Sequence, residues 1–217
     1  MPRKIATGAT KSAAEKWALP VRQARSRATR ERLLAAAEKV FAEKGYDGAK
    51  LSDIAEEAGV SVGAVYFRFK DKDALFLAIA ESFIAETRVR LGDYVLEGRQ
   101  HPTEDVIRNF VQRTAANLAT HRGLFRAIIE RGFDHPPVMT IMFSFRDEIA
   151  SSFETVLHER GGASGLGDAV RVVTQMVYGF LLLGILNPNA PAQRNVKAAI
   201  GGLADAVVAY LKTVVPK

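Results

Sequence analysis

Ser61 is the residue whose immediate neighbours most directly suggest catalytic chemistry. It lies within Gly59-Val60-Ser61-Val62-Gly63, a run that matches the G-x-S-x-G pattern of a nucleophile elbow. In that elbow a strand leads into the serine and holds its hydroxyl at the tip of a sharp turn. The residues before Gly59 have a helical pattern instead. We therefore predict that the chain is not an enzyme.

Histidine and cysteine, common ligands of protein-bound zinc, do not form a metal-binding pattern here. The four histidines, His101, His121, His135 and His158, lack the paired spacing of a helical metal site, and the chain contains no cysteine. We interpret each histidine as a surface residue and expect neither a metal nor another cofactor. Without cysteine there is no disulfide framework, so the composition does not call for an oxidising compartment.

Apolar stretches in this sequence are too short for secretion or membrane insertion. The first thirty residues lack the apolar segment of a secretory signal. The longest apolar run, Met176 to Leu186, has 11 residues, whereas a membrane-spanning helix needs roughly 20. We interpret this run as a buried helix and expect a cytoplasmic protein without a membrane partner.

Positive charge is concentrated at the N-terminal end. The net charge is +6, and residues 1–32 hold nine Lys or Arg against Glu15 and Glu31. Residues 76–217 are close to neutral, with 15 basic and 14 acidic residues. A basic end beside a neutral body suggests an anionic partner, and double-stranded DNA fits better than a membrane because the segment lacks an apolar face. The alternative interpretation is a solvated tail.

The hydrophobic pattern predicts helices throughout the chain after an irregular start. Residues 1–25 show no sustained periodicity, so we expect a disordered basic arm, in which Trp17 has no evident role. From Thr29 the apolar residues follow one helical stripe, and Gly45 is placed to end that helix. Strand patterns are absent. Further helices are expected at about 73–96, 103–119, 122–132, 137–160, 166–187 and 192–214.

Two short segments between these helices have the pattern of a helix-turn-helix. Leu51 to Ala58 predicts a short helix, and Gly59 follows where a left-handed turn residue is needed. Ser61 can then cap the next helix by accepting a hydrogen bond from an amide of its first turn. In a helix-turn-helix the second helix enters the major groove of DNA.

Residues Arg30 to Leu75 resemble the DNA-binding domain of the tetracycline-repressor-like (TetR) family of bacterial regulators. The resemblance rests on three consecutive motifs: RERLLAAAEKVFAEKGYDG, DIAEEAGVS and VGAVYFRFKDKDAL. It implies an all-α protein with an N-terminal three-helix helix-turn-helix domain and a larger C-terminal helical domain for ligand binding and dimerisation. The expected bounds are 26–72 for the DNA-binding domain, with its motif at about 50–69, and 73–217 for the C-terminal domain.

The resemblance also implies which residues contact DNA. Ser61, Tyr66 and Lys72 would contact phosphates, Tyr66 with its ring packed and its hydroxyl on the backbone. Arg22, Arg25, Arg27 and Arg30 could enter the minor groove or belong to a disordered arm. The full predicted DNA-binding set is Arg30, Lys50, Ser52, Ser61, Val62, Gly63, Ala64, Tyr66, Phe67 and Lys72.

The second helix departs from the family pattern at its start. Lys50 stands where the family usually has a capping Ser or Thr. Either Lys50 reaches a phosphate as a point charge, or Ser52 caps a slightly shorter helix. Val62, Gly63 and Ala64 offer few side-chain hydrogen bonds, so base recognition could depend on thymine methyl groups and DNA shape.

For the C-terminal domain the resemblance implies an effector pocket and a dimer interface on the last two long helices. The pocket would take a small hydrophobic or aromatic ligand, with Arg126, Arg131 or Arg146 at its edge for a carboxylate; the alternative is that its lining is ordinary core. The predicted pocket residues are Phe83, Phe110, Phe125, Ile128, Met139, Met142, Phe143 and Arg146. The predicted interface residues are Val173, Val177, Phe180, Leu181, Gly184, Leu203, Val207 and Tyr210.

Together these features predict a homodimeric, sequence-specific transcriptional regulator. Repression, relieved when a small apolar effector releases the protein from a palindromic operator, is what the resemblance implies. The alternatives are a non-specific architectural DNA-binding protein or an activator.

Overall fold

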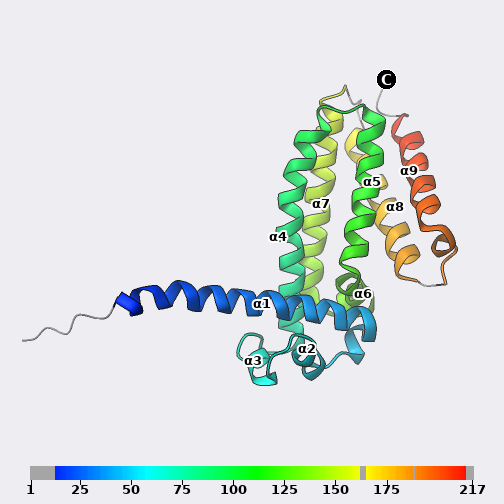
Figure 1. Cartoon of the computed structure of the whole chain (residues 1–217). Coiled ribbons are helices and arrows are strands. Elements are labelled where there is room, and N and C mark those ends of the chain that lie inside the picture. The colour runs from blue at the N-terminus through cyan, green and yellow to red at the C-terminus, as the bar shows by residue number, and fades with distance from the viewer. Residues whose placement is uncertain (1–12, 162–164, 188, 214–217) are drawn as a thin grey trace, which may run out of the picture.

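The computed structural model describes residues 13–161, 165–187 and 189–213, and the side chains of 13–23, 185–186 and 191–192 are outside that description. Its helices form a small N-terminal domain beneath an upright bundle (Figure 1). Within the described residues there is no strand. The all-α class predicted from the sequence is therefore confirmed.

The N-terminal domain consists of α1 (Ala13–Gly48), α2 (Leu51–Glu57) and α3 (Val62–Tyr66). Gly45 has φ 73° and Gly59 has φ 63°, conformations that glycine adopts without a Cβ clash. The first interrupts the helical geometry near the end of α1, and the second makes the turn between α2 and α3. Both glycines have the roles predicted for them.

The expectation of a disordered arm over residues 1–25 is wrong for its second half, because α1 begins at Ala13. The Thr29 hydroxyl, near the predicted helix start, donates to the Arg25 carbonyl oxygen at 2.9 Å, as in a helix interior. The Ala- and Arg-rich sequence before Thr29 has high helix propensity and simply continues the helix. Residues 1–12 and the side chains of Trp17 and Arg22 lie outside the description.

The C-terminal bundle follows the predicted helix order, with boundaries within a few residues of the predicted ones. Two short 3-10 helices add to the predicted pattern, one between α6 and α7 and one before the last helix. The elements are α4 (Lys72–Gly98), α5 (Thr103–Thr120), α6 (Arg122–Arg131), η1 (Gly132–Asp134), α7 (Pro136–His158), α8 (Leu166–Leu186), η2 (Pro191–Asn195) and α9 (Val196–Leu211).

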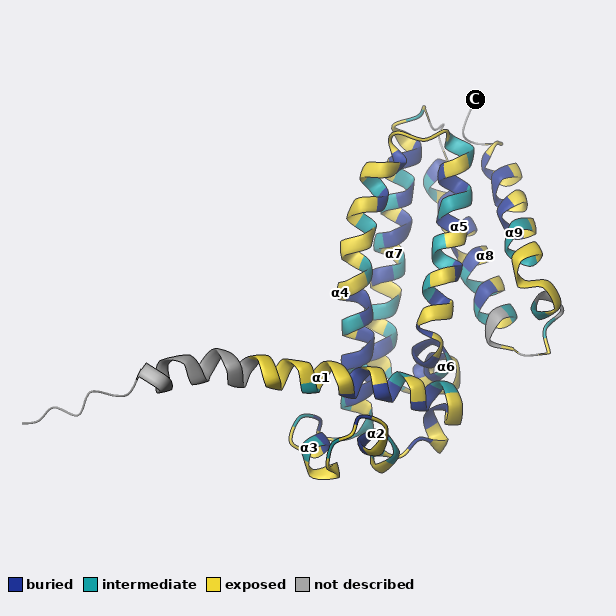
Figure 2. Ribbon diagram, in the orientation of Figure 1, coloured by how far each residue is buried: buried dark blue, intermediate teal, exposed yellow. Residues whose placement is uncertain are grey.

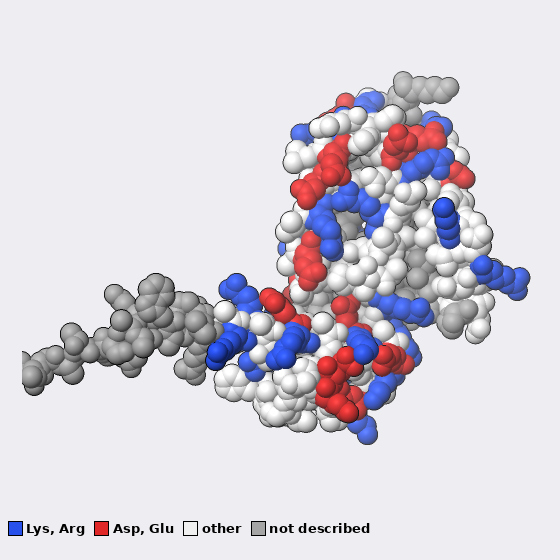
Figure 3. All heavy atoms as spheres, in the orientation of Figure 1, with Lys and Arg blue, Asp and Glu red and all other residues white. Residues whose placement is uncertain are grey.

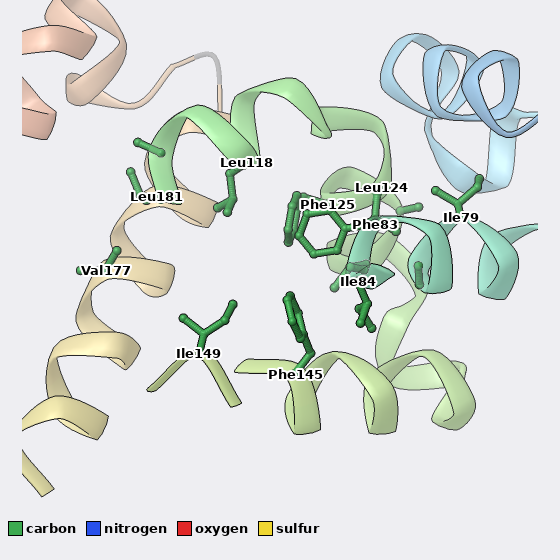
Figure 4. Close-up of a cluster of buried hydrophobic side chains, with 14 of the residues drawn as sticks. Ile79, Phe83, Ile84, Leu118, Leu124, Phe125, Phe145, Ile149, Val177 and Leu181 are labelled. Atoms are coloured by element: carbon green, nitrogen blue, oxygen red, sulfur yellow. The ribbon is translucent and has the colours of Figure 1, made fainter. Parts of the chain in front are cut away.

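Aromatic side chains fill the centre of the bundle. Phe83 packs edge-on against Phe125 and Phe145, with ring centroids 5.3 and 6.1 Å apart (Figure 4). Phe110 and Phe153 are stacked at 4.3 Å. These contacts join α4, α5, α6 and α7, so the bundle has a continuous hydrophobic core.

Helix α6 joins the bundle to the N-terminal domain through a close crossing with α1. A Cβ at Gly123 would overlap the Glu38 carbonyl oxygen and lie 3.1 Å from the Ala42 nitrogen. The Arg126 guanidinium also donates to the Ala42 carbonyl at 2.7 Å, and the Tyr46 amide donates to the Glu130 carboxylate at 2.6 Å. The α1–α6 seam is thus closed by backbone contact and charge-assisted hydrogen bonds.

Helix α9 lies at the edge of the bundle with exposed residues on its outer side (Figure 2), and α8 also has exposed apolar residues. In the described part of the chain, the segment Leu166–Gly184 passes a length and composition test for a membrane span, and 39% of it is buried in the protein. The expectation of a buried helix over Met176–Leu186 is thus only half right. One side of α8 is in the core and the other faces outward.

Candidate nucleic-acid interface and ligand cavity

Helix α3 presents its apolar side chains to solvent. Ser61 caps it as predicted, because its hydroxyl accepts a hydrogen bond from the Ala64 amide at 3.2 Å. Val65 is fully buried and anchors the helix, whereas Val62, Tyr66 and Phe67 are 40%, 58% and 84% exposed. The Tyr66 ring is therefore not packed in the core as expected. Exposed aromatic side chains on a fixed, capped helix are suited to contact a partner.

Helix α2 begins without a cap from the side chain of Lys50. Instead the Asp53 carboxylate accepts from the Lys50 amide at 3.2 Å, and the Lys44 ammonium lies 3.0 Å from Asp53. These contacts hold the pKa of Asp53 below its ordinary value, the hydrogen bond with Lys44 contributing most. Ser52 does not cap a shorter helix. Both Lys50 and Ser52 are exposed, so their predicted contacts with DNA remain predictions.

Lys72 faces the protein rather than open solvent, a role that the sequence did not reveal. Its ammonium donates to the carbonyl oxygens of Tyr46 and Ala49 at 2.6 and 3.0 Å and lies 4.4 Å from the Tyr46 ring centroid. The Tyr46 hydroxyl donates a hydrogen bond to the Asp73 carboxylate. The pKa of Tyr46 is raised, mainly by burial and to a lesser extent by this hydrogen bond. Lys72 therefore ties the end of α1 to the start of α4. One of its three N–H donors is left over for the predicted phosphate contact.

Basic side chains gather along α1, and an acidic group lies over the neighbouring α2 region (Figure 3). Arg25, Arg27 and Arg30 are exposed on α1, and Glu56 and Glu57 are exposed on α2. The charge favourable to DNA is thus supplied from the α1 side of the domain. The remaining predicted contacts, Gly63 and Ala64, lie in the first turn of α3 beside Val62.

A separate cavity of about 280 Å³ lies between α4, α5, α7 and α8. Figure 3 shows a hollow between α4 and α5 with basic side chains around it. Leu91, Phe110 and Ile149 form the apolar part of its wall, and Tyr94 and Tyr178 also line it. Burial raises the pKa of both tyrosines, which keeps their phenols protonated. The other polar lining residues are Thr87, Arg90, Arg113, Thr114, Asn117 and Thr120.

The N-terminal residues match a known family model. Residues 33–79 match the model described as bacterial regulatory proteins of the tetR family. These residues form a TetR-family domain. The match spans the end of α1, the helix-turn-helix and the start of α4, so the exposed face of α3 belongs to the part of the chain that the family defines.

Curated relatives of this TetR-family domain are named as HTH-type regulators. The chain is 41% identical over 75 residues to YvdT of Bacillus subtilis, an HTH-type transcriptional regulator, covering 35% of this chain and 36% of that one. It is 42% identical over 76 residues to BepR of Brucella suis, an HTH-type transcriptional repressor, covering 34% of each. The chain thus spans about a third of the length of the curated relatives it matches.

Solved structures extend the similarity of fold beyond the TetR-family domain. A transcriptional regulator from Rhodococcus sp. superposes with a TM-score of 0.70 at 22% identity, covering 85% of this chain and 97% of that one. FadR of Bacillus subtilis, solved in complex with stearoyl-CoA, superposes with a TM-score of 0.58 at 19% identity, covering 83% and 96%. At these identities the similarity establishes the fold of the C-terminal domain.

Of the eight residues predicted for an effector pocket, only Phe110 lines the cavity between α4, α5, α7 and α8, so the pocket set as a whole stays a prediction. Phe83, Phe125 and Ile128 are buried in the core. Met139 and Met142 are partly buried against it, and Arg146 lies over the exposed Phe143 ring. Two of the arginines predicted at the pocket edge have other partners. Arg126 donates a hydrogen bond to the Ala42 carbonyl of α1, and Arg131 forms ion pairs with Asp47 and Asp134.

Polar residues at helical spacing are the sequence signal for this cavity. On α4 the lining residues Thr87, Arg90 and Tyr94 follow one another at intervals of three and four, and on α5 so do Arg113 and Asn117. Polar residues that recur on one face of a helix are unusual in a packed core, and Arg90 is exposed. Selecting aromatic residues instead identified the core, which is where large apolar side chains are most often found.

Most of the residues predicted for a dimer interface belong to the core of the single chain. The large apolar residues that face outward on α8 are Val172, Met176, Phe180 and Leu183, which are 46%, 41%, 38% and 71% exposed, and of these only Phe180 was predicted. Gly184 is half-buried, and Phe180 and Tyr210 are exposed as an interface requires. The predicted residues buried within the chain are Val173, Val177, Leu181, Leu203 and Val207.

The histidines are also not all on the surface. His121 is buried, with its Nδ1 3.0 Å from the Glu38 carboxylate and its ring 5.0 Å from that of Phe83. His135 is half-buried, and its Nδ1 has no hydrogen-bond partner within the structure. In the described residues no group of His, Asp and Glu is arranged to hold a metal ion.

Proposed function

We propose that this chain is a cytoplasmic transcriptional repressor that binds a palindromic operator as a homodimer. The exposed face of α3 carries the proposal: a capped helix anchored by Val65 presents Val62, Tyr66 and Phe67 outward. Apolar side chains of this kind fit thymine methyl groups and sugars, while the α3 N-terminus and Ser61 suit a phosphate. Arg25, Arg27 and Arg30 on α1 would add contacts that depend on charge but not on sequence.

The exposed apolar sides of α8 and α9 support the homodimer. On α8 the outward residues Val172, Met176, Phe180 and Leu183 recur at helical spacing and form one stripe. Among the described residues, a Cβ added at Gly179, Gly201 or Gly202 would meet no atom within 4 Å beyond its own stretch of helix, so a second chain could approach closely there. A dimer would present two α3 helices to successive major grooves, about 34 to 36 Å apart.

The cavity between α4, α5, α7 and α8 is the proposed effector site. Helix α4 begins at Lys72, bonded to the end of α1, and lines the cavity through Thr87, Leu91 and Tyr94. A ligand that alters the position of α4 would therefore act on the N-terminal domain through a continuous helix. A coupling free energy of about 1 to 3 kcal/mol between the two sites would be enough to change operator occupancy.

Selection of bound sequences from random duplex DNA at physiological salt tests the proposal. The wild-type chain should enrich a palindrome, and a Tyr66→Ala, Phe67→Ala variant should bind that palindrome at least about tenfold more weakly. The matched control is Phe133→Ala, which removes an aromatic side chain that is 79% exposed on η1. Circular dichroism of each variant verifies that the helices are retained.

Two results would contradict the proposal. Equal, strongly salt-dependent binding of all duplexes would indicate a non-specific architectural protein. Enrichment of a palindrome that Tyr66→Ala, Phe67→Ala retains unchanged would remove α3 as the recognition element. A reporter gene fused to the selected operator then distinguishes repression from activation.

A further inference from the structure

We infer that the cavity between α4, α5, α7 and α8 binds a small aromatic carboxylate through Arg90. The inference deepens the proposed function, on which it rests for the view that the cavity is an effector site. It is carried by the contacts of Arg90, by the charge balance of the lining residues and by the cavity's apolar wall.

Arg90 is held in place by neutral groups only. Its Nη2 donates to the Asn117 Oδ1 at 3.0 Å and to the Thr87 hydroxyl at 3.4 Å, and the Asn117 amide donates to the same hydroxyl at 3.2 Å. An arginine has five N–H donors in a planar fork, so Nε and Nη1 keep donors for a further partner. The guanidinium is thus oriented by the protein without being neutralised.

Two neighbouring arginines differ from Arg90 in having a carboxylate partner. Arg88 makes a two-pronged contact with Glu148, at 2.7 to 3.0 Å. Arg113, which also lines the cavity, is 2.9 Å from Glu97 and lies over the Tyr94 ring at 5.6 Å. Among the described residues, Arg90 forms no such ion pair.

The charge of the lining residues favours an anionic ligand. Arg90 and Arg113 both line the cavity, whereas no Asp or Glu does. Since Glu97 already faces Arg113, the charge available to a ligand is that of Arg90. A carboxylate matches a guanidinium in shape and can accept two parallel hydrogen bonds from it.

The remaining wall favours a compact aromatic body. Leu91, Phe110 and Ile149 line the apolar part, and a volume of about 280 Å³ is near the lower end of the range for ligand pockets. Tyr178 also lines the cavity, and its hydroxyl makes no hydrogen bond to other described residues. Because burial raises its pKa, this phenol is a neutral donor for a second polar group of the ligand.

Isothermal titration calorimetry of the full chain with matched acids and amides tests the inference. The probes are benzoate, 2-naphthoate and indole-3-acetate, each compared with its primary amide, which has nearly the same shape without the charge. At least one acid should bind wild-type protein about tenfold or more tightly than its amide. Arg90→Gln should remove this preference, and Arg122→Gln, at an exposed α6 position outside the cavity, should retain it.

Equal binding of acid and amide, a preference that survives Arg90→Gln, or no binding of any acid would overturn the inference. The calorimetry contains no DNA, so it is independent of the proposed regulatory function. A separate measurement adds the acid that binds to a complex of the protein with its selected operator. Arg90-dependent binding that leaves this complex intact would support the ligand class and contradict the effector role.

Discussion

The α1–α6 seam and the outer face of α8 and α9 both contain glycine, but their surroundings are opposite. At the seam, Gly123 lets the backbone of α6 approach Glu38 and Ala42 so closely that a Cβ has no room. On the outer face, Gly179, Gly201 and Gly202 have open space where a Cβ would be. The α1–α6 seam is therefore packed within one chain, whereas no described residue of the same chain packs against the glycines of the outer face.

The seam therefore contributes to the stability of the single chain, and the outer face to its proposed association with a second chain. The seam also contains charge-assisted bonds from Arg126 and to Glu130, so its geometry is set by the chain's own backbone. The outer face instead exposes Met176 and Phe180, apolar groups whose burial would favour association. We therefore expect substitutions at the seam to change unfolding, and substitutions on the outer face to change oligomeric state.

Gly123→Ala should have the largest effect. The new methyl group would overlap the Glu38 carbonyl, so α6 must move away from α1, at a cost of about 3 kcal/mol in the free energy of unfolding. Urea denaturation followed by circular dichroism measures this. Gly92→Ala is the matched control, since its Cβ meets no atom within 4 Å on α4, and it should stabilise by about 0.5 to 1 kcal/mol. Equal effects of the two changes would contradict the closed seam.

Phe180→Glu should act on assembly. A carboxylate placed in the middle of an apolar interface would be desolvated without a partner, weakening the dimer by about 2 kcal/mol, or roughly 30-fold in the dissociation constant. Analytical ultracentrifugation over a concentration series measures that constant. The control is Leu96→Glu, at a position 61% exposed on α4, a helix outside the proposed interface. A wild-type chain that sediments as a monomer would disprove the interface.

Glu130→Gln should have the smallest effect on stability, and it tests how much the Glu130 charge contributes to the α1–α6 seam. The change keeps the shape of the side chain but removes its negative charge. The Glu130 carboxylate accepts a hydrogen bond from the Tyr46 amide and forms an ion pair with Arg126 at 2.8 Å. We expect a loss of about 1 kcal/mol and faster hydrogen exchange at the Tyr46 amide. Glu81→Gln, at an exposed position of α4, is the control. An unchanged exchange rate would show that backbone packing alone closes the seam.

Local patterns predicted the helices and the cap of α3 well. Gly45, Gly59 and Ser61 affect only the backbone within a few residues, so the neighbouring sequence is enough to predict their roles. The arm before Thr29 was misjudged because an exposed helix of polar and small residues has little apolar periodicity. Helix propensity was the better guide there.

Contacts between distant residues account for the remaining errors. Lys72 bonds Tyr46 and Ala49 from the far side of the helix-turn-helix, which its spacing alone does not indicate. Likewise, the cavity between α4, α5, α7 and α8 is formed where polar positions of α4 and α5 meet. Identifying it requires knowledge of which helix faces oppose one another.

The sequence by itself determined the helical class, the element order and the exposed capped helix α3, because propensity, capping and periodicity are local properties. Only the tertiary structure decided which side of each apolar helix enters the core. Val177 and Phe180 lie on the same apolar helix, yet Val177 is fully buried and Phe180 is exposed. The physical reason is that burial depends on what packs against a residue, and a helix with apolar residues on most sides does not specify which side faces the core.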